Sequence, residues 1–286
     1  MPAATTHVEF AKDVYNLLPY TQREKITNKQ MYYLGSQGPD LFFFSRASVI
    51  PGSLKKYGNL MHDDKVTEVI HCFEEYAGDD PDLNSYIYGY LCHYALDSIA
   101  HPLICAVAKY RHETTGIHEG EAHVTMEADI DVWLLHQRGR LSKDYNVWKS
   151  LKQTTQDLIK LAEMLHHMLK EVFDADVSLN TVKQSVFEVS FWTGFLYPKK
   201  ITHGFITTFE RITRMPHSLS GMMLYERNDT TIINLDHRKY PARWDENIII
   251  SDSFPQLYGK AVLKAEKLIA SHEDSDFPVN FCGEPY

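Results

Sequence analysis

Two histidines and an aspartate lie four residues apart, at His93, Asp97 and His101, within an otherwise apolar stretch. An α-helix turns by about 100° per residue, so each step of four residues rotates a side chain by only about 40°. All three side chains are therefore expected on one face of a helix. Unpaired imidazole and carboxylate groups are costly to bury, and mutual hydrogen bonds or a bound cation are the usual compensation. The spacing predicts a metal-binding helix.

This helix is expected to serve two metal ions. A rise of about 1.5 Å per residue separates His93 from His101 by about 12 Å along the axis, whereas zinc–nitrogen bonds are only about 2 Å long. One ion therefore cannot bind both imidazoles. Pro102 lacks a backbone N–H and disfavours helical geometry at His101, so we expect the helix to kink or restart there.

A second pair with helical spacing follows at His123 and Glu127, with Asp131 one turn further on. Such a pair is part of a site for a divalent metal, and His101 is the candidate for its third ligand. A single pair of this kind is more often an ordinary surface hydrogen bond. Two such units on helices with apolar flanks favour metal binding.

Two candidate ligands lie nearer the start of the chain. Asp40 follows a Gly-Pro turn and leads into an apolar segment, where a simple turn residue is the alternative. His7 lies near the start of a predicted helix over residues 8–17, and an exposed terminal histidine is the alternative. Both depend on the fold to bring them to the helix that carries His93.

The sequence His62-Asp63-Asp64 precedes an amphipathic segment that begins at Val66. Aspartate is favoured at the N-cap of a helix, so Asp63 or Asp64 is expected to cap this segment. His62 has no comparable structural role, which makes it a further candidate ligand.

Helices are the elements that must position these residues. Apolar residues recur at helical spacing along residues 66–73, 158–172 and 258–269. Strict two-residue alternation is nearly absent, and the one β-branched cluster, residues 230–233, stands alone. Polar and glycine-bearing stretches at 35–40, 51–59, 78–82, 112–121, 139–146 and 227–247 are expected to be loops. The chain is therefore predicted to be all-α.

Length and composition fit one large globular domain. The chain has 286 residues, of which 44% are hydrophobic and 23% are charged, and its 15 histidines suggest a metal or acid–base role. We expect a single all-α domain over residues 1–286. Residues 1–138 would carry the metal ligands, and residues 147–286 would supply supporting helices and a C-terminal segment.

The net charge and the cysteine content limit which partners and which cellular location we expect. The net charge is -9, and because phosphate-backbone binding needs clustered lysine and arginine, nucleic acid is not the default partner. The four cysteines lack Cys-x-x-Cys spacing and are expected to be reduced. An export signal and an apolar run of about 18 residues are both absent. We therefore expect a cytoplasmic protein with no transmembrane segment.

In type and order, the candidate ligands resemble those of the zinc-dependent phospholipase C family, whose relatives include the single-strand-specific zinc nucleases. They are His7, Asp40, His62, His93, Asp97, His101, His123 and Glu127. Members of that family are all-α and hold three zinc ions in a cleft. The resemblance implies a first ion bound by Asp40, His62, His93 and Asp97. It implies a second bound by His101, His123 and Glu127, and a third bound by His7 with Asp97 as a bridge.

Two features depart from the secreted members of that family. Those members begin with a tryptophan that binds the third zinc, whereas this sequence begins Met1-Pro2 and its first tryptophan is Trp133. They also have more residues between the positions of Asp97 and His101. We therefore expect two or three zinc ions per chain, with other divalent metals as alternatives.

The activity implied by the resemblance is hydrolysis of a phosphodiester by metal-activated water, with a phospholipid head group as one possible substrate. Asp40 is the residue implied to accept a proton from that water. One alternative is an HD-type phosphohydrolase, another all-α metal fold, in which Asp63 would be a ligand. The other is a helical scaffold with closed, non-catalytic metal coordination.

Overall fold

A computed structural model describes residues 4–48, 51–195, 200–213 and 231–286. This part of the chain is mainly helical, with only two short strands, which confirms the all-α prediction. The helices up to residue 137 are α1 (Ala4–Leu17), α2 (Tyr20–Arg23), α3 (Lys29–Gly35), the 3₁₀-helix η1 (Gly38–Ser48), α4 (Lys55–Asp63), α5 (Val66–Ala77), α6 (Pro81–Thr115) and α7 (Glu119–Gln137).

The described residues beyond position 137 are also mainly helical. The helices are η2 (Ser142–Asp144), α8 (Trp148–Leu151), α9 (Thr155–Phe173), α10 (Leu179–Phe195), α11 (Lys200–Thr213), η3 (Thr231–Ile233), α13 (Phe254–Ala270) and η4 (Asp274–Asp276). Two short strands, β1 (Tyr240–Pro241) and β2 (Ile249–Ile250), pair antiparallel. The prediction of one domain over residues 1–286 stays a prediction.

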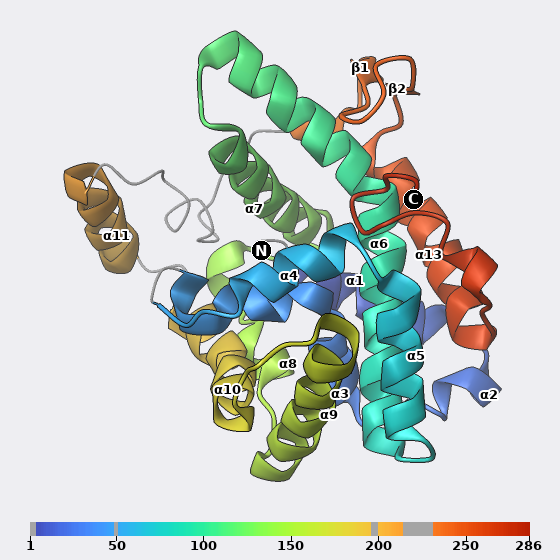
Figure 1. The fold of residues 1–286 in the computed structure, drawn as a ribbon. Coiled ribbons are helices and arrows are strands. Elements are labelled where there is room, and N and C mark those ends of the chain that lie inside the picture. Colours follow the sequence, from blue (N-terminus) through green and yellow to red (C-terminus); the bar gives the residue numbers. More distant parts are fainter. Residues whose placement is uncertain (1–3, 49–50, 196–199, 214–230) are drawn as a thin grey trace.

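Helix α6 is the central element of the fold (Figure 1). It packs against α3, α13, α7, α1 and α5, and most of its side chains between Leu83 and Ala108 are buried. Within the described residues it is also the one helix long and apolar enough to cross a bilayer, an apolar stretch that the sequence reading did not expect. Because 89% of that apolar window is buried inside the protein, its side chains form core contacts.

Pro102 lies inside α6, and the helix is continuous through it over 35 residues. Of the two expected alternatives, a kink or a restart, the helix does not restart at this position. Figure 1 shows that the helix bends along its length, in keeping with the predicted kink. A proline inside a helix removes one backbone hydrogen bond and bends the axis without ending the helix when packing supports both sides.

Two glycines allow α3 and α6 to cross at close range. A Cβ atom at Gly35 would lie 2.0 Å from the carbonyl oxygen of Tyr86, and one at Gly89 would lie 2.0 Å from that of Tyr32. No side chain fits at such distances, so the backbones can approach only because both residues lack a Cβ. Since η1 follows α3 after two residues, this crossing places the start of η1 beside the middle of α6.

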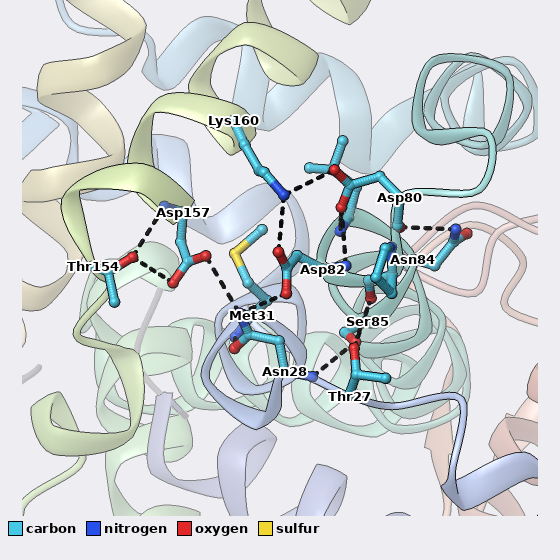
Figure 2. Close-up of polar contacts among 12 residues, drawn as sticks. Thr27, Asn28, Met31, Asp80, Asp82, Asn84, Ser85, Thr154, Asp157 and Lys160 are labelled. Carbon is cyan, nitrogen blue, oxygen red and sulfur yellow. Dashed lines mark hydrogen bonds and ion pairs between the residues drawn. The ribbon is translucent and has the colours of Figure 1, made fainter.

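Three helix N-termini meet in one polar junction (Figure 2). Asn28, Asp80 and Thr154 are the N-caps of α3, α6 and α9, and each accepts a backbone N–H of its own helix. The Asn28 amide also donates to Asp82 at 3.1 Å, and Lys160 donates to Asp80 and Asp82 at 2.9 Å each. The junction fixes where these three helices start relative to one another.

Neither Asp63 nor Asp64 caps α5, so that prediction is wrong. Helix α4 continues through Asp63, and the N-cap of α5 is Lys65, which adopts a left-handed conformation with φ of 61°. The sharp turn leaves Asp64 at the C-cap of α4, where its carboxylate accepts the Lys65 N–H at 2.8 Å. The side chain of Asp63 is exposed.

The predicted helices around residues 66–73, 158–172 and 258–269 are present as α5, α9 and α13. The predicted loop at 51–59 is partly wrong because α4 begins at Lys55, with Tyr57 and Met61 buried along one side. At 112–121 only residues 116–118 separate α6 from α7. Residues 227–230 lie outside the described part of the chain.

Candidate metal centre

Helix α6 carries its three candidate ligands on one buried face, as their spacing predicts. Oδ2 of Asp97 lies 2.9 Å from Nε2 of His93 and 3.6 Å from Nε2 of His101. The side chains are all less than 10% exposed. One carboxylate thus lies between two imidazoles that are a full two turns apart on the helix.

Two further imidazoles approach the same carboxylate from other helices. Nε2 of His7, on α1, lies 3.3 Å from Oδ1 of Asp97, and Nε2 of His62, on α4, lies 3.9 Å from Oδ2. Burial alone would raise the pKa of Asp97, but His101, His93 and His7 together hold that pKa well below its usual value. Asp97 is therefore an ionised carboxylate at the centre of the cluster.

We define the first group as Asp40, His62, His93, Asp97 and His7. Donor atoms of His62, His93 and Asp97 lie within 4.8 Å of one another, and so do those of His7, Asp40 and His93. Nε2 of His62 is 3.2 Å from Oδ1 of Asp40. The His7 ring stacks on that of His93 with centroids 4.1 Å apart, so His7 adjoins the other four residues.

The outer nitrogens of two first-group histidines are held by backbone carbonyls. Nδ1 of His93 donates to the Ser36 carbonyl at 2.9 Å, and Nδ1 of His62 donates to that of Gly58 at 2.7 Å. Gly38 has a φ of 50°, and a Cβ there would lie 2.3 Å from the His93 ring. With a proton on Nδ1 of each ring, Nε2 is the nitrogen that faces the carboxylates, and it is the one available to a metal once it carries no proton.

Asp40 is ionised despite its burial. Burial alone would raise its pKa, but nearby positive charge together with the hydrogen bond to His62 holds the pKa below its usual value. An ionised carboxylate at this place can bind a metal or accept a proton.

We define the second group as His101, His123 and Glu127, which α6 and α7 bring together. Oε1 of Glu127 lies 3.3 Å from Nε2 of His101 and 3.2 Å from Nε2 of His123. All three donor atoms lie within 4.8 Å of one another. The His123 side chain is 26% exposed, whereas His101 and Glu127 are below 10%. This group therefore reaches solvent through His123.

Protonation differs among the histidines of the centre. Burial and the neighbouring His93 lower the pKa of His7 to about 4, so His7 is neutral near pH 7. Burial also opposes a charge on His123, but the adjacent Glu127 carboxylate outweighs it and raises the pKa to about 9. His123 must therefore lose a proton before its Nε2 can bind a metal.

The donor set fits zinc. Imidazole nitrogens and carboxylate oxygens are the ligands that zinc takes in proteins besides thiolates. Nε2 of His93 and Oδ2 of Asp97 are buried 2.9 Å apart without a well-formed hydrogen bond, which is unusual for buried polar atoms. A cation between them would satisfy both.

The sequence pattern described as zinc-dependent phospholipase C matches residues 6–179. This match covers more than half of the chain and every residue of both groups. The chain belongs to the zinc-dependent phospholipase C family. The resemblance inferred from the motifs is thereby confirmed, whereas neither the curated proteins nor the solved structures contain a match to the chain.

Two residues that the sequence analysis singled out, Asp63 and Asp131, lie outside both ligand groups. The exposed Asp63 is in neither group, which removes the observation that favoured an HD-type site. Asp131 is also outside both groups: its carboxylate accepts the backbone N–H groups of Thr5 at 3.3 Å and Thr6 at 2.7 Å. It thereby holds the first turn of α1, which carries His7, against α7. Residues 1–3, where secreted members carry their tryptophan, lie outside the described part.

Residues 277–286 pack against the centre, although they follow the region that matches the zinc-dependent phospholipases C. The backbone N–H of Phe281 donates to the carbonyl of His62 at 3.1 Å. Its fully buried ring lies 5.4 Å from the His62 ring and 5.5 Å from that of His93. The backbone N–H of the next residue, Cys282, donates to Oδ1 of Asn280 at 2.9 Å. Sequence reasoning missed these contacts because the segment carries no periodic or motif signal.

Proposed function

We propose that this member of the zinc-dependent phospholipase C family is a phosphodiester hydrolase whose two ligand groups bind zinc. The second group carries the proposal. It offers three protein donors and reaches solvent through His123. Catalytic zinc sites have three protein ligands and a position for water or substrate, whereas structural sites have four protein ligands and are closed.

In this proposal the first zinc would be held by Asp40, His62, His93 and Asp97, and the second by His101, His123 and Glu127. A third would be held by His7 and Asp97, whose Nε2 and Oδ1 lie 3.3 Å apart. When bound, zinc draws charge from the phosphoryl oxygens and lowers the pKa of a coordinated water. We propose two or three ions per chain; the donor atoms of the described residues form three clusters, of which two share His93.

The side chains around the ions have separate proposed roles in charge balance, proton transfer and ligand orientation. Asp97 faces both groups, because its Oδ2 lies 2.9 Å from Nε2 of His93 and 3.6 Å from Nε2 of His101. Asp40, ionised and 3.2 Å from His62, is the proposed acceptor of the proton from the attacking water. The carbonyls of Ser36 and Gly58 keep the imidazoles of His93 and His62 in the tautomer that leaves Nε2 free.

A phospholipid head group is the proposed substrate class, in line with the family. Of the aromatic residues near η1, Phe42 and Phe44 are buried in the core, whereas Phe43 is partly exposed and stacks on the His62 ring with centroids 5.4 Å apart. Phe43 can therefore contact an apolar part of a substrate at the first group.

We further propose a cytoplasmic location, which the four free cysteines support.

Glu127→Gln tests the proposal, with Asp63→Asn as the matched control. Both changes remove one carboxylate charge, but only Glu127 lies in a ligand group. Zinc per chain and hydrolysis of an aryl phosphodiester and of phosphatidylcholine vesicles are measured. Glu127→Gln should lose one ion and reduce turnover by more than the roughly 10–100-fold typical of residues behind the ligands. Asp63→Asn should match the parent.

Three outcomes would contradict the proposal. Full turnover of Glu127→Gln would remove the second group from the chemistry. One zinc or fewer in the parent, purified with added metal and without a chelating column, would rule out a multinuclear centre. A parent that holds two ions but hydrolyses neither substrate would instead be a metal-binding scaffold.

A further inference from the structure

Helix α10 exposes a stripe of aromatic side chains. Phe187, Phe191 and Phe195 lie four residues apart, so they share one helix face, and they are 53%, 50% and 48% exposed. Their rings stack in sequence, with centroids 6.3 Å apart between the first two and 6.5 Å apart between the last two. Single exposed apolar residues are common on protein surfaces, whereas a contiguous apolar patch marks an interaction site.

Tryptophan rings and a groove widen this stripe. Trp192 makes edge contacts with Phe191 and Phe195, with centroids 5.1 Å and 5.6 Å apart. A groove of about 210 Å³ opens beside the stripe, and its walls include Phe187, Phe191 and Trp148 of α8. We define the aromatic patch as these three phenylalanines and two tryptophans.

Basic side chains border the aromatic patch. Lys183 lies one turn before Phe187 on the same face of α10. Lys152 also lines the groove, and its Nζ lies 5.7 Å from the centroid of the Trp148 ring. The surface therefore combines aromatic rings with positive charge, although the chain as a whole is acidic.

Helix α11 carries a second exposed apolar stripe. Phe205, Phe209 and Ile212 follow helical spacing and are 72%, 49% and 77% exposed. Arg211 is exposed away from this stripe. Figure 1 shows α11 at one side of the molecule, away from α6. A helix with aromatic residues on its apolar face and basic residues off it can lie in the plane of a bilayer surface.

The 3₁₀-helix η1 connects the aromatic patch with the candidate metal centre. Helix α10 packs along η1, which carries Asp40 of the first group. The carboxylate of Glu188 on α10 accepts the backbone N–H of Arg46 on η1 at 2.5 Å. A surface that binds α10 would therefore be coupled to the element that carries the proposed proton acceptor.

We propose that the aromatic patch of α10 and the exposed stripe of α11 dock this protein on a phospholipid bilayer. Aromatic rings and lysines are typical of the boundary between membrane and water, whereas lysine is depleted at protein–protein interfaces. Lipid phosphates complement the charges of Lys152 and Lys183. The inference rests on the proposed phospholipid substrate and goes beyond it, because docking uses none of the zinc ligands.

Serine substitutions with a matched control test the docking. Phe191→Ser and Phe205→Ser each remove one exposed ring, and Leu263→Ser removes an apolar side chain that is 68% exposed on α13. Lys152→Glu is paired with Lys25→Glu, because both lysines are exposed. Zinc-free and zinc-loaded protein are sedimented with vesicles of phosphatidylcholine, alone or mixed with phosphatidylglycerol. Turnover of vesicle lipid and of a soluble aryl phosphodiester is measured in parallel.

The parent should bind both kinds of vesicle with or without zinc. Phe191→Ser and Phe205→Ser should each weaken binding about tenfold, because burial of a half-exposed phenylalanine contributes roughly that factor. Lys152→Glu should weaken binding to the mixed vesicles only. Hydrolysis of vesicle lipid should fall with binding, while turnover of the soluble diester stays at the parent value. Leu263→Ser and Lys25→Glu should match the parent.

A parent that stays in solution with both kinds of vesicle would overturn the inference, as would equal losses for Phe191→Ser and Leu263→Ser. It would also be overturned if Phe191→Ser and Phe205→Ser split a dimer and left vesicle binding intact, since the face would then join two copies of the chain. If Phe191→Ser fails to fold, Phe205→Ser decides, because Phe205 lies outside the core. Vesicle binding without turnover of either substrate would overturn the proposed hydrolase and support docking, so the two failures are distinguishable.

Discussion

At the scale of single residues, the arrangement around Asp97 explains how one helix can serve two groups. His93 and His101 are too far apart along α6 to share an ion, yet both face the same carboxylate. His7 and His62 approach it from α1 and α4. A negative charge at this point offsets the charge of ions in either group.

Asp97→Asn should therefore disturb both groups at once. The amide keeps the size of the side chain but removes the charge that offsets a dication, so zinc content and the melting temperature should fall together. Turnover should be lost with the metal. Metal analysis and thermal unfolding with and without a chelator measure the effect. A variant with full zinc and full turnover would show that Asp97 is no bridge.

Zinc binding at the second group should tighten as the pH rises towards about 9. The pKa of His123 is raised to about 9, so below that pH each bound ion must displace a proton from His123. Affinity should increase by at least about tenfold per pH unit below 9, because the Asp97 carboxylate outweighs burial and also raises the pKa of His101, which must lose its proton as well. His7, with a pKa of about 4, adds nothing in this range. Calorimetry in buffers of different ionisation enthalpy counts the protons; no release near pH 7 would contradict the prediction.

Spacing predicted the residues on α6 and α7 because positions four apart must share a helix face. It could not predict that Phe281 reaches the same centre. The contacts of Phe281 with His62 and His93 join residues far apart in the sequence, and no local pattern specifies such a contact. Likewise, the left-handed turn at Lys65 replaces the expected aspartate cap, and a lysine gives no local signal for that conformation.

At the scale of elements, the crossing of α3 and α6 positions the first group. Asp40 and the Ser36 carbonyl follow α3 directly, so they reach His93 only if the two helices stay in close contact. Periodicity predicted α5, α9 and α13, whose apolar stripes are clear. It could not predict this crossing. The sequence shows where the glycines are, but it does not show which segment of backbone packs against them.

Gly89→Ala should destabilise the protein and lower its zinc content. The new Cβ would lie 2.0 Å from the Tyr32 carbonyl oxygen, and forcing extra volume into a packed contact costs about 1–3 kcal/mol. Gly259→Ala on α13 is the control: its Cβ would meet nothing within 4 Å, so the change should stabilise by about 0.5–1 kcal/mol. Urea unfolding of the two variants measures both effects. Equal stability would show that α3 and α6 do not depend on this close approach.

At the scale of the whole molecule, segments from both ends of the described chain meet at the centre. The first turn of α1 is held by Asp131 on α7, and the Phe281 N–H donates to His62 on α4. Metal binding should therefore stabilise these distant segments together, because an ion that binds only the folded form stabilises it.

Removal of zinc should accelerate hydrogen exchange at the amides of Phe281 and Thr6. Both amides are hydrogen-bonded to groups that hold or adjoin ligands, so local opening becomes easier when the ions leave. Amides in the middle of α9, which carries no ligand, should keep their protection. Hydrogen-exchange mass spectrometry with and without chelator tests this. Unchanged exchange at Phe281 and Thr6 would show that the ends do not respond to the metal.

The packing of Phe281 against His62 and His93 also sets an order of events during synthesis. His7 leaves the ribosome long before Phe281, and at about 5–20 residues per second the interval is roughly a quarter of a minute to a minute. During this interval the imidazoles and carboxylates of the nascent chain are not yet covered by the Phe281 ring that packs on them in the folded protein. An ion captured early would meet an unfinished site, so correct loading belongs to the last step of folding.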